Sequence, residues 1–441
     1  MIPLIVVTDR RSINASVGSH TREMKTHVKC ADCTNILPSD TNQSTCANCG
    51  GLLSVEHAPA ATGADLKADL DDRARNMGFG HDPFARSGVW RFRDIVLDAG
   101  DDAIVSHPEG NTPLLSRAPA ARYAGVDGLL IKHEGYNPTG SFKDRGMTVA
   151  LTQARRIGAR AVACASTGNT SASLSAYASQ AGIPSFVFVP EGRVAAGKLA
   201  QTVAYGARTL RIRGDFDDCL RLAIDASEKL GVYLVNSVNP FRIEGQKTIV
   251  FEMLQQLGWN APDWIALPAG NLGNTSAFGK ALAEAHRWGL IDRIPRLLAV
   301  QASGASPFAQ SFAHHFAERI RVRAETRATA IRIGDPASWD RAVRAIEGTN
   351  GFVEAVTDDE IFAAKRVIDQ CGIGCEPASA ASVAGVRALA ARGVIHRDDR
   401  VVAVLTGHVL KDPGSVETQQ DDALTSAEAL ALLERVVNTG G

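Results

Sequence analysis

Residues 137–145 read NPTGSFKDR, and the segments on either side of this stretch decide the fold. The apolar run GLLI at 128–131 comes before it, and GMTVALTQAR at 146–155 follows with the composition of a helix. We therefore expect a buried strand, a turn and a helix, with Lys143 at the helix N-terminus. Free backbone N–H groups give that end a partial positive charge, so it favours an anion and disfavours an ammonium group.

Lys143 has two possible roles at such a position. A lysine driven toward its neutral form is a nucleophile, and its usual chemistry is a Schiff base. A single lysine in the first turn of a helix is more commonly a solvated surface group. The turn itself does not decide between these roles, so the decision depends on which groups the rest of the chain places beside Lys143.

Buried strands alternate with helices from residue 128 onward. Further short apolar runs predict strands at 161–165, 185–189, 209–212, 232–235, 264–267, 297–300 and 401–405. Helices are expected to begin at about residues 169, 215, 241 and 275, and another helix is expected to run through residue 199. A capping box at 357–360 begins a further helix. Strands that are apolar throughout and alternate with helices are typical of parallel sheets covered on both faces. The fold class is therefore α/β.

The composition excludes several classes of partner. The chain has 441 residues, of which 45% are hydrophobic and 22% charged, enough for a large core. Its 47 basic and 48 acidic residues leave a net charge of -1, so we expect no nucleic-acid partner. Apolar runs fall short of the ~20 residues that cross a bilayer, and residues 1–7 lack the basic leader of a signal peptide. We expect no membrane partner and a cytoplasmic location.

Half of the cysteines form two CxxC pairs separated by twelve residues, namely Cys30 with Cys33 and Cys46 with Cys49. Each pair can direct two thiolates at one ion, and four thiolates complete a tetrahedral zinc site. Two disulfides or free thiols are the alternatives, and a reducing compartment disfavours the disulfides. Because cysteine fills all four positions and few basic residues lie nearby, we expect a structural zinc ribbon.

Polar turns follow four of the expected strands. In parallel sheets, ligands bind at these carboxyl ends of the strands. STGNTS at 166–171 can hold a carboxylate at a helix N-terminus, and GNLGN at 270–274 can close its backbone around a phosphate. NSVNPFR at 236–242 offers a second anion site through Arg242, and Thr406 offers a hydroxyl. Each turn alone is also an ordinary helix cap or a flexible loop.

Taken together, these turns supply what a pyridoxal phosphate site requires. Lys143 would bind the aldehyde of the cofactor, and residues 270–274 would bind its phosphate. Thr406 would meet the pyridine nitrogen with a neutral hydroxyl, which leaves the ring unprotonated but still permits eliminations. The combination favours the catalytic role of Lys143 over the solvated one.

The same motifs resemble the threonine synthases of the tryptophan-synthase-β-like family, the fold type II pyridoxal phosphate enzymes. The resemblance rests on GNTPL at 110–114, NPTGSFKDRG at 137–146, STGNT at 166–170, GKLAQ at 197–201, VNSVNPFR at 235–242, EGQKT at 244–248, GNLGN at 270–274, EPASAAS at 376–382 and TGHVLKDP at 406–413. It implies a homodimer with two parallel-sheet domains after a small zinc ribbon. The expected division is an extension at 1–29, a ribbon at 30–57, a connecting arm at 58–105, a catalytic body at 106–415 with a mobile smaller subdomain at about 150–235, and a C-terminal helix at 416–441.

The resemblance also implies a role for each site residue. Lys143 would form the Schiff base and move protons at Cα and Cβ, and Asn169 would bind the 3-hydroxyl of the cofactor. The cofactor phosphate would be bound by Gly270, Asn271, Leu272, Gly273 and Asn274, and the ring nitrogen by Thr406. The substrate carboxylate would be bound by Ser166, Thr167 and Thr170, and the phosphate of O-phosphohomoserine by Lys198, Asn236, Ser237 and Arg242. The implied reaction is γ-elimination of phosphate and addition of water at Cβ, which yields threonine.

Three positions depart from the family pattern. Val409 replaces a glycine, Asp335 replaces an asparagine beside the expected phosphate pocket, and Cys375 replaces an apolar residue. They leave open a related lyase that replaces or eliminates a group at Cβ of phosphoserine, resembling cysteate synthase. A zinc-ribbon interaction protein on a non-catalytic body is the alternative from another class. Met24 is an alternative translation start.

Overall fold

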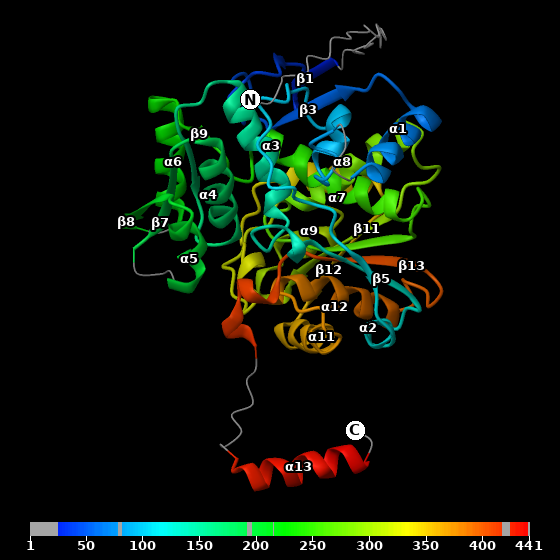
Figure 1. The fold of residues 1–441 in the computed structure, drawn as a ribbon. Coiled ribbons are helices and arrows are strands. Elements are labelled where there is room, and N and C mark those ends of the chain that lie inside the picture. Colours follow the sequence, from blue (N-terminus) through cyan, green and yellow to red (C-terminus); the bar gives the residue numbers. More distant parts are fainter. Residues whose placement is uncertain (1–24, 78–81, 192–195, 215, 417–423, 440–441) are drawn as a thin grey trace, which may run out of the picture.

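A computed structural model describes residues 25–77, 82–191, 196–214, 216–416 and 424–439 of the chain (Figure 1). Most of the predicted N-terminal extension and the alternative start at Met24 lie outside these residues. Two sheets form the body, one parallel throughout and one parallel except for an edge strand, which confirms the predicted α/β class. Among the described helices, none combines the length and the apolar character that a membrane crossing requires.

The larger sheet has six strands in the order β12-β11-β10-β13-β5-β4. The strands are β4 (Leu114–Ser116), β5 (Gly128–His133), β10 (Trp264–Pro268), β11 (Arg296–Ala302), β12 (Phe352–Val356) and β13 (Arg400–Leu405). All pairs are parallel except β4 with β5. The apolar runs at 128–131, 264–267, 297–300 and 401–405 thus lie in four adjacent central strands, whereas β12 at the edge was not predicted.

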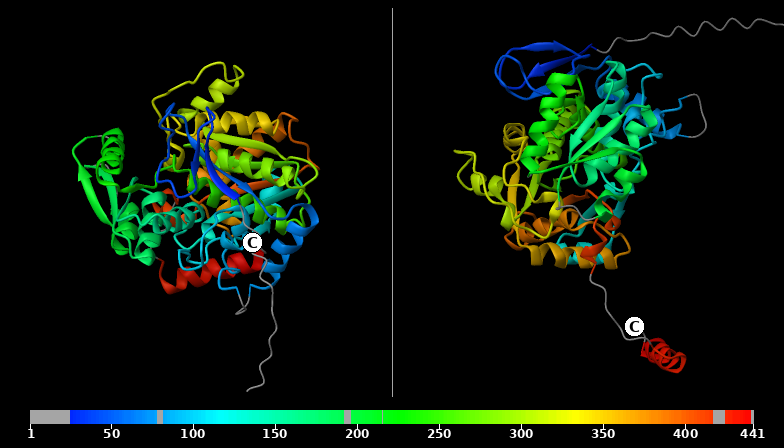
Figure 2. Two further views of the ribbon diagram at one scale, coloured as in Figure 1. Left: turned by 90° about the horizontal axis from the view of Figure 1, so that it is seen from above. Right: turned by 90° about the vertical axis from the view of Figure 1, so that its left-hand side faces the viewer.

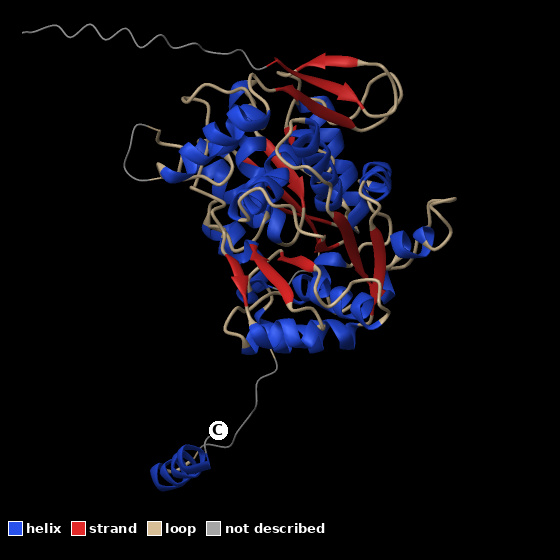
Figure 3. Ribbon diagram, turned by 90° about the vertical axis from the view of Figure 1, so that its right-hand side faces the viewer, coloured by secondary structure: helices blue, strands red, loops and turns tan. Residues whose placement is uncertain are grey.

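Helices cover both faces of this sheet (Figure 3). Along β10, Ile265 and Leu267 join the core on one face, whereas Trp264 and Ala266 join the core on the other. Successive strand side chains point to opposite faces, so a strand covered on both sides is apolar throughout. One face carries α7 (Pro240–Gln256), α8 (Gly273–Arg287) and α10 (Trp339–Gly348), and the other carries α2 (Ala118–Ala124), α11 (Asp358–Gln370) and α12 (Pro377–Ala391).

The smaller sheet has four parallel strands in the order β8-β7-β6-β9 and lies beside the larger one (Figure 1). Its strands are β6 (Val162–Ala165), β7 (Ser185–Pro190), β8 (Arg208–Ile212) and β9 (Tyr233–Leu234). Its helices are α4 (Asn169–Ala181), α5 (Ala196–Ala204) and α6 (Phe216–Leu230). Every strand predicted in this part of the chain is present, within two residues of its expected bounds.

The two CxxC pairs belong to a three-stranded antiparallel sheet of order β2-β1-β3, the ribbon. Its strands are β1 (Lys25–Cys30), β2 (Ile36–Pro38) and β3 (Leu53–Ala58), so the sheet includes five residues before Cys30. Figure 2 shows the ribbon at one end of the molecule, and β3 lies against α7. The ribbon is therefore packed onto the catalytic body.

The segment after the ribbon also packs on the body. It contains α1 (Gly63–Arg75) and a short 3-10 helix, η1 (Trp90–Ile95). Trp90 is fully buried, and its indole Nε1–H donates to Thr148 Oγ1 of α3 (Lys143–Arg156) at 2.8 Å. At the other end of the chain, α13 (Ser426–Thr439) lies within residues 416–441, the segment for which a C-terminal helix is expected.

A buried cluster of charges lies behind the first turn of α3. Arg145 contacts two carboxylates, with Nε 2.7 Å from Glu134 Oε2 and Nη2 2.8 Å from Glu252 Oε1. Lys132 Nζ lies 2.6 Å from the same Glu252 oxygen, and all four side chains are inaccessible to solvent. Burial alone would lower the pKa of Arg145, but the charges of Glu134 and Glu252 raise it above its ordinary value. The cluster joins β5, α3 and α7 at the point where α3 begins.

Candidate active site

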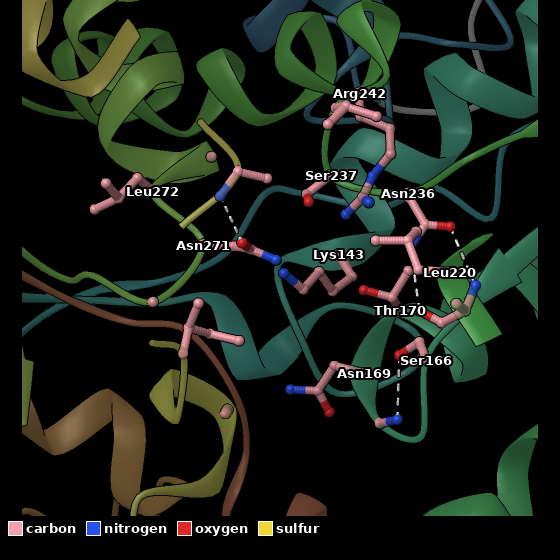
Figure 4. A pocket seen from close by; sticks show the side chains of 18 of the residues that line it. Lys143, Ser166, Asn169, Thr170, Leu220, Asn236, Ser237, Arg242, Asn271 and Leu272 are labelled. Atoms are coloured by element: carbon pink, nitrogen blue, oxygen red, sulfur yellow. Dashed lines mark hydrogen bonds between the residues drawn. The ribbon is translucent and has the colours of Figure 1, made fainter. Parts of the chain in front are cut away.

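A cavity of about 1420 Å³ opens where the carboxyl ends of strands from both sheets meet. The ends of β6, β9, β10 and β13 all contribute to its wall. The predicted site residues that line it are Lys143, Ser166, Thr167, Asn169, Thr170, Asn236, Ser237, Arg242, Gly270, Asn271, Leu272, Gly273, Asn274 and Thr406. Several of them converge on one space in Figure 4. Lys198 belongs to α5, and its side chain lies outside the described part of the structure.

Lys143 is the first residue of α3, as the sequence predicts. Burial lowers the pKa of Lys143 to about 7, and the positive charge of Arg242 acts in the same direction. Asp144 holds the turn by accepting from Thr139 N at 2.7 Å, from Thr139 Oγ1 at 2.6 Å and from Ser173 Oγ at 2.6 Å. The amine is therefore positioned by a rigid turn and is nucleophilic near neutral pH.

The turn at 270–274 connects β10 to α8 and presents backbone donors to the cavity. The first amide bonded into the helix is Ser276 N, which donates to Leu272 O at 3.0 Å, so the three N–H groups before it are available to a ligand. A Cβ on Gly270 would meet Ile331 Cα at 3.1 Å, and only a glycine fits this approach without displacing its neighbour. Both polar atoms of the Asn274 side chain are buried and have no partner within the described chain. The free backbone N–H groups and the Asn274 Nδ2 donor fit a phosphate group.

Thr406 lies at the end of β13 and is 5% exposed. Its Oγ1 lies 2.9 Å from Ser379 Oγ and 3.5 Å from Glu376 Oε1. Ser379 also accepts from Gly407 N at 2.9 Å, which fixes the hydroxyl pair. A hydroxyl held in this way is compatible with a pyridine nitrogen opposite it.

Glu376 is a cavity residue that the sequence reasoning did not assign. Asn169 Nδ2 donates to Glu376 Oε2 at 3.0 Å, so this carboxylate lies between Asn169 and Thr406. Burial raises the pKa of Glu376, and the hydrogen bond from Asn169 acts in the opposite direction. No local signal in the sequence marked Glu376: it is the N-cap residue of α12, but its side chain makes no capping hydrogen bond.

Arg242 provides a second group of donors that lack partners. It is 1% exposed, and its Nη1 donates to Val235 O at 3.0 Å. Its Nε and Nη2 are buried without a partner among the described residues, and burial lowers its pKa to about 10. An unpaired buried guanidinium that lines a cavity is a strong candidate for binding an anion.

The other predicted residues of this part of the cavity differ in how many of their polar groups are already hydrogen-bonded within the protein. Asn236 Oδ1 accepts from Ala165 N, and its Nδ2 donates to Ala165 O, both at 3.1 Å. This amide therefore connects β6 to the start of α7 and has one N–H left for a ligand. Ser237 lines the cavity beside Arg242 (Figure 4), and Ser166 Oγ accepts from Gly168 N at 3.3 Å in the turn that begins α4.

The three departures from the family pattern leave the cavity donors in place. Asp335 lies at the cavity rim and pairs with Arg319 and Arg321, so its charge is compensated. Cys375 is fully buried, and burial raises its pKa well above the ordinary value, so it remains a neutral thiol. Val409 begins a short 3-10 helix, η5 (Val409–Lys411), after the Thr406 turn.

The four clustered cysteines converge in the ribbon. Their sulfur atoms all lie within 4.8 Å of one another. Cys30 Sγ is 3.5 Å from Cys49 Sγ, and Cys33 Sγ is 3.7 Å from Cys46 Sγ. A tetrahedral ion with metal–sulfur bonds of about 2.3 Å requires sulfur atoms about 3.8 Å apart. The cluster can therefore hold one metal ion.

Comparison with known proteins agrees with this geometry. The family described as "Pyridoxal-phosphate dependent enzyme" matches residues 105–407. The chain is 41% identical to a threonine synthase of Methanocaldococcus jannaschii, over 93% of this chain and 98% of that protein. It is 50% identical to a threonine synthase of Mycobacterium bovis, over 72% of this chain and 86% of that protein.

The fold also matches solved structures. The processed form of threonine deaminase isoform 2 from Solanum lycopersicum superimposes with a TM-score of 0.59 at 18% identity, covering 86% of this chain and 95% of that one. Identity this low supports the fold alone. The family match over residues 105–407 and the identity to the two threonine synthases show the family as well: the chain belongs to the threonine synthase family of pyridoxal-phosphate dependent enzymes.

Proposed function

We propose that the chain converts O-phospho-L-homoserine and water to L-threonine and phosphate. One observation carries the proposal: a single cavity holds Lys143 together with two separate groups of unpaired anion-binding donors. The N–H groups and Asn274 at the start of α8 suit the phosphate of pyridoxal phosphate. The guanidinium of Arg242 is then available for a second phosphate, which only a phosphorylated substrate brings.

The cavity residues divide the work of this reaction. When bound, pyridoxal phosphate draws electrons from the bonds at the amino-acid Cα, so that protons can leave the neighbouring carbons. Lys143, with a pKa of about 7, can accept and return protons at Cα and Cβ near neutral pH. Thr406 would face the ring nitrogen and Asn169 the 3-hydroxyl, while Ser166, Thr167 and Thr170 would hold the substrate carboxylate. Arg242 and Ser237 would hold the departing phosphate.

The test is a paired assay on the cofactor-loaded protein. With O-phosphohomoserine we expect phosphate and L-threonine in equal amounts. With phosphoserine we expect little phosphate, since the β-replacing alternative is the one that uses a three-carbon substrate. Release of phosphate from phosphoserine alone, with no threonine from O-phosphohomoserine, would show that the proposal is wrong.

The rate at which the apoprotein takes up pyridoxal phosphate should depend on pH. The neutral amine is the nucleophile, so the rate should rise as the pH passes through about 7 and become constant above it. A lysine with an ordinary pKa, about 10.4, would instead give a rate that keeps rising to about pH 10. Stopped-flow absorbance between pH 6 and 10 distinguishes the two profiles.

Replacing Arg242 with methionine should raise KM for O-phosphohomoserine by roughly 30-fold to 100-fold, because a charged hydrogen bond to the substrate phosphate is lost. The cofactor should still bind, with an unchanged absorbance spectrum, because its phosphate contacts come from α8. The KM of Arg242→Lys should lie between those of the wild type and Arg242→Met, since lysine keeps the charge but not the planar fork of the guanidinium. An unchanged KM in both variants would place the substrate phosphate elsewhere in the cavity.

We also propose that the tetracysteine cluster holds a structural Zn²⁺, supported by its four thiol ligands and their spacing. A cytoplasmic location agrees with the reduced thiols that such a site needs. A homodimer is proposed from the family resemblance.

A further inference from the structure

The ribbon reaches the catalytic cavity through residues 39–47, which we call the ribbon loop. This loop runs from the end of β2 to the second CxxC pair. Asn42, Gln43, Ser44, Thr45 and Ala47 line the same cavity as Lys143 and Arg242. A module that sequence analysis separates from the catalytic body by the whole connecting arm thus supplies part of the catalytic cavity wall.

The first half of the ribbon loop is anchored on α3. Gln153 Nε2 donates to Ser39 O at 2.9 Å and to Thr41 O at 3.1 Å. Arg156 Nη2 donates to Ser39 Oγ at 3.2 Å. Gln153 is fully buried, so these bonds are shielded from water. Because α3 begins with Lys143, the loop and the lysine are fixed to the same helix.

The second half of the loop is anchored by the tetracysteine cluster. Cys46 N donates to Gly51 O at 2.8 Å, and Asn35 Nδ2 donates to Cys46 Sγ at 3.3 Å. The ribbon itself is bonded to α7, where His57 Nε2 lies 2.8 Å from Glu244 Oε2 with both side chains buried. The position of residues 42–45 therefore depends on α3 at one end and on the cysteine knuckle at the other.

The chemistry of the loop suits a polar, phosphorylated ligand. From Thr41 to Thr45 the chain has no charged side chain, but it offers amide and hydroxyl donors. Such groups can bond phosphate or carboxylate oxygens without placing another charge beside Arg242. Asn42 and Gln43 are exposed toward the cavity, and an uncharged wall selects by position and not by long-range attraction.

We propose that Asn42 and Gln43 form part of the wall that binds the phosphorylated amino acid, and that the tetracysteine cluster serves the reaction by holding them there. This inference rests on the proposed function. It gives the ribbon a positioning role in substrate binding, beyond a structural role in the fold. Because Lys143, and not the loop, would move the protons, substrate binding should change and the chemical step should not.

The first test is the double variant Asn42→Ala with Gln43→Ala in the cofactor-loaded enzyme. We expect KM for O-phosphohomoserine to rise about threefold to tenfold, with kcat within about twofold and the cofactor absorbance unchanged. Asn48→Ala is the matched control, because Asn48 is an exposed amide in the same ribbon outside the cavity wall. Its KM should equal that of the wild type. A double variant that behaves like this control overturns the inference.

The second test concerns the anchor. Cys30→Ser with Cys33→Ser should abolish bound zinc, raise KM to the same extent as the loop variant and speed amide hydrogen exchange in residues 39–47. A zinc-free variant with the KM and loop exchange of the wild type overturns the role of the cluster. If this variant does not fold, the loop variant alone decides.

The proposed function and the inference fail in different ways. Wild-type enzyme that forms no threonine overturns the function and the inference with it. Active wild-type enzyme with an unaffected loop variant overturns only the inference. Hydrogen exchange separates them further: substrate that protects residues 236–242 but leaves residues 42–47 unchanged binds the cavity without the ribbon loop and rejects the inference.

Discussion

Lys143→Ala is expected to lower kcat for threonine formation by about 10⁴-fold, with no change in the stability of the fold. The substitution removes both the amine that binds the cofactor aldehyde and the group that moves protons at Cα and Cβ. Loss of a proton-transfer group alone costs up to about 10⁴-fold. Steady-state kinetics gives the loss, and borohydride reduction followed by peptide mapping should recover cofactor on Lys143 in the wild type and on no residue in the variant.

Lys229→Ala is the matched control for this prediction. Lys229 lies on the exposed face of α6, where its Nζ is 3.0 Å from Asp225 Oδ2. The control should keep wild-type kcat and cofactor content, because an exposed ion pair one helical turn apart contributes little. If Lys143→Ala kept a tenth of the wild-type kcat, or still carried cofactor after reduction, another amine would be the nucleophile.

Much of this site could be predicted because its parts lie at the ends of parallel strands. The turns at 166–170, 236–242, 270–274 and 406 are far apart in sequence, but each follows an apolar run that sequence analysis recognises as a strand. Parallel strands end at one edge of a sheet, so recognising the strands brings the turns together without a calculation of the fold. The pKa of Lys143 is lowered by burial and by the charge of Arg242, so the shift depends on the meeting of these turns.

Other features depend on contacts that no local pattern contains. Asn236 was predicted to bind substrate phosphate, but its amide is largely used by Ala165 of a neighbouring strand. Glu376 lies in the cavity at the start of α12, where Asn169 of α4 donates to it, and the ribbon loop enters the cavity because Gln153 binds Thr41, 112 residues away in sequence. Such positions follow from the packing of distant elements, which sequence periodicity does not encode.

Replacing Arg145 with methionine is expected to lower the free energy of unfolding by about 3–5 kcal/mol. The variant keeps most of the side-chain volume but leaves Glu134 and Glu252 buried with one fewer counter-charge, and removal of one partner from a buried ion cluster costs about this much. Urea unfolding of the apoprotein, followed by tryptophan fluorescence, measures the change. Arg397→Met is the matched control, because Arg397 pairs with Asp127 on the surface and should change the midpoint little.

A second substitution tests whether the loss comes from stranded charge. Adding Glu134→Gln to Arg145→Met removes one of the carboxylates that lost its partner, so the double variant should recover part of the lost stability. Full additivity of the two single losses would mean that the cluster is not coupled, contrary to the distances of 2.7 and 2.8 Å. The predictions for Lys143 and Arg145 also separate two functions within one helical turn. Lys143 is needed for the chemistry, whereas Arg145, two residues later, is needed for the fold that positions Lys143. Variants at 143 should therefore unfold like the wild type, whereas Arg145→Met, once folded and loaded with cofactor, should retain most of its kcat.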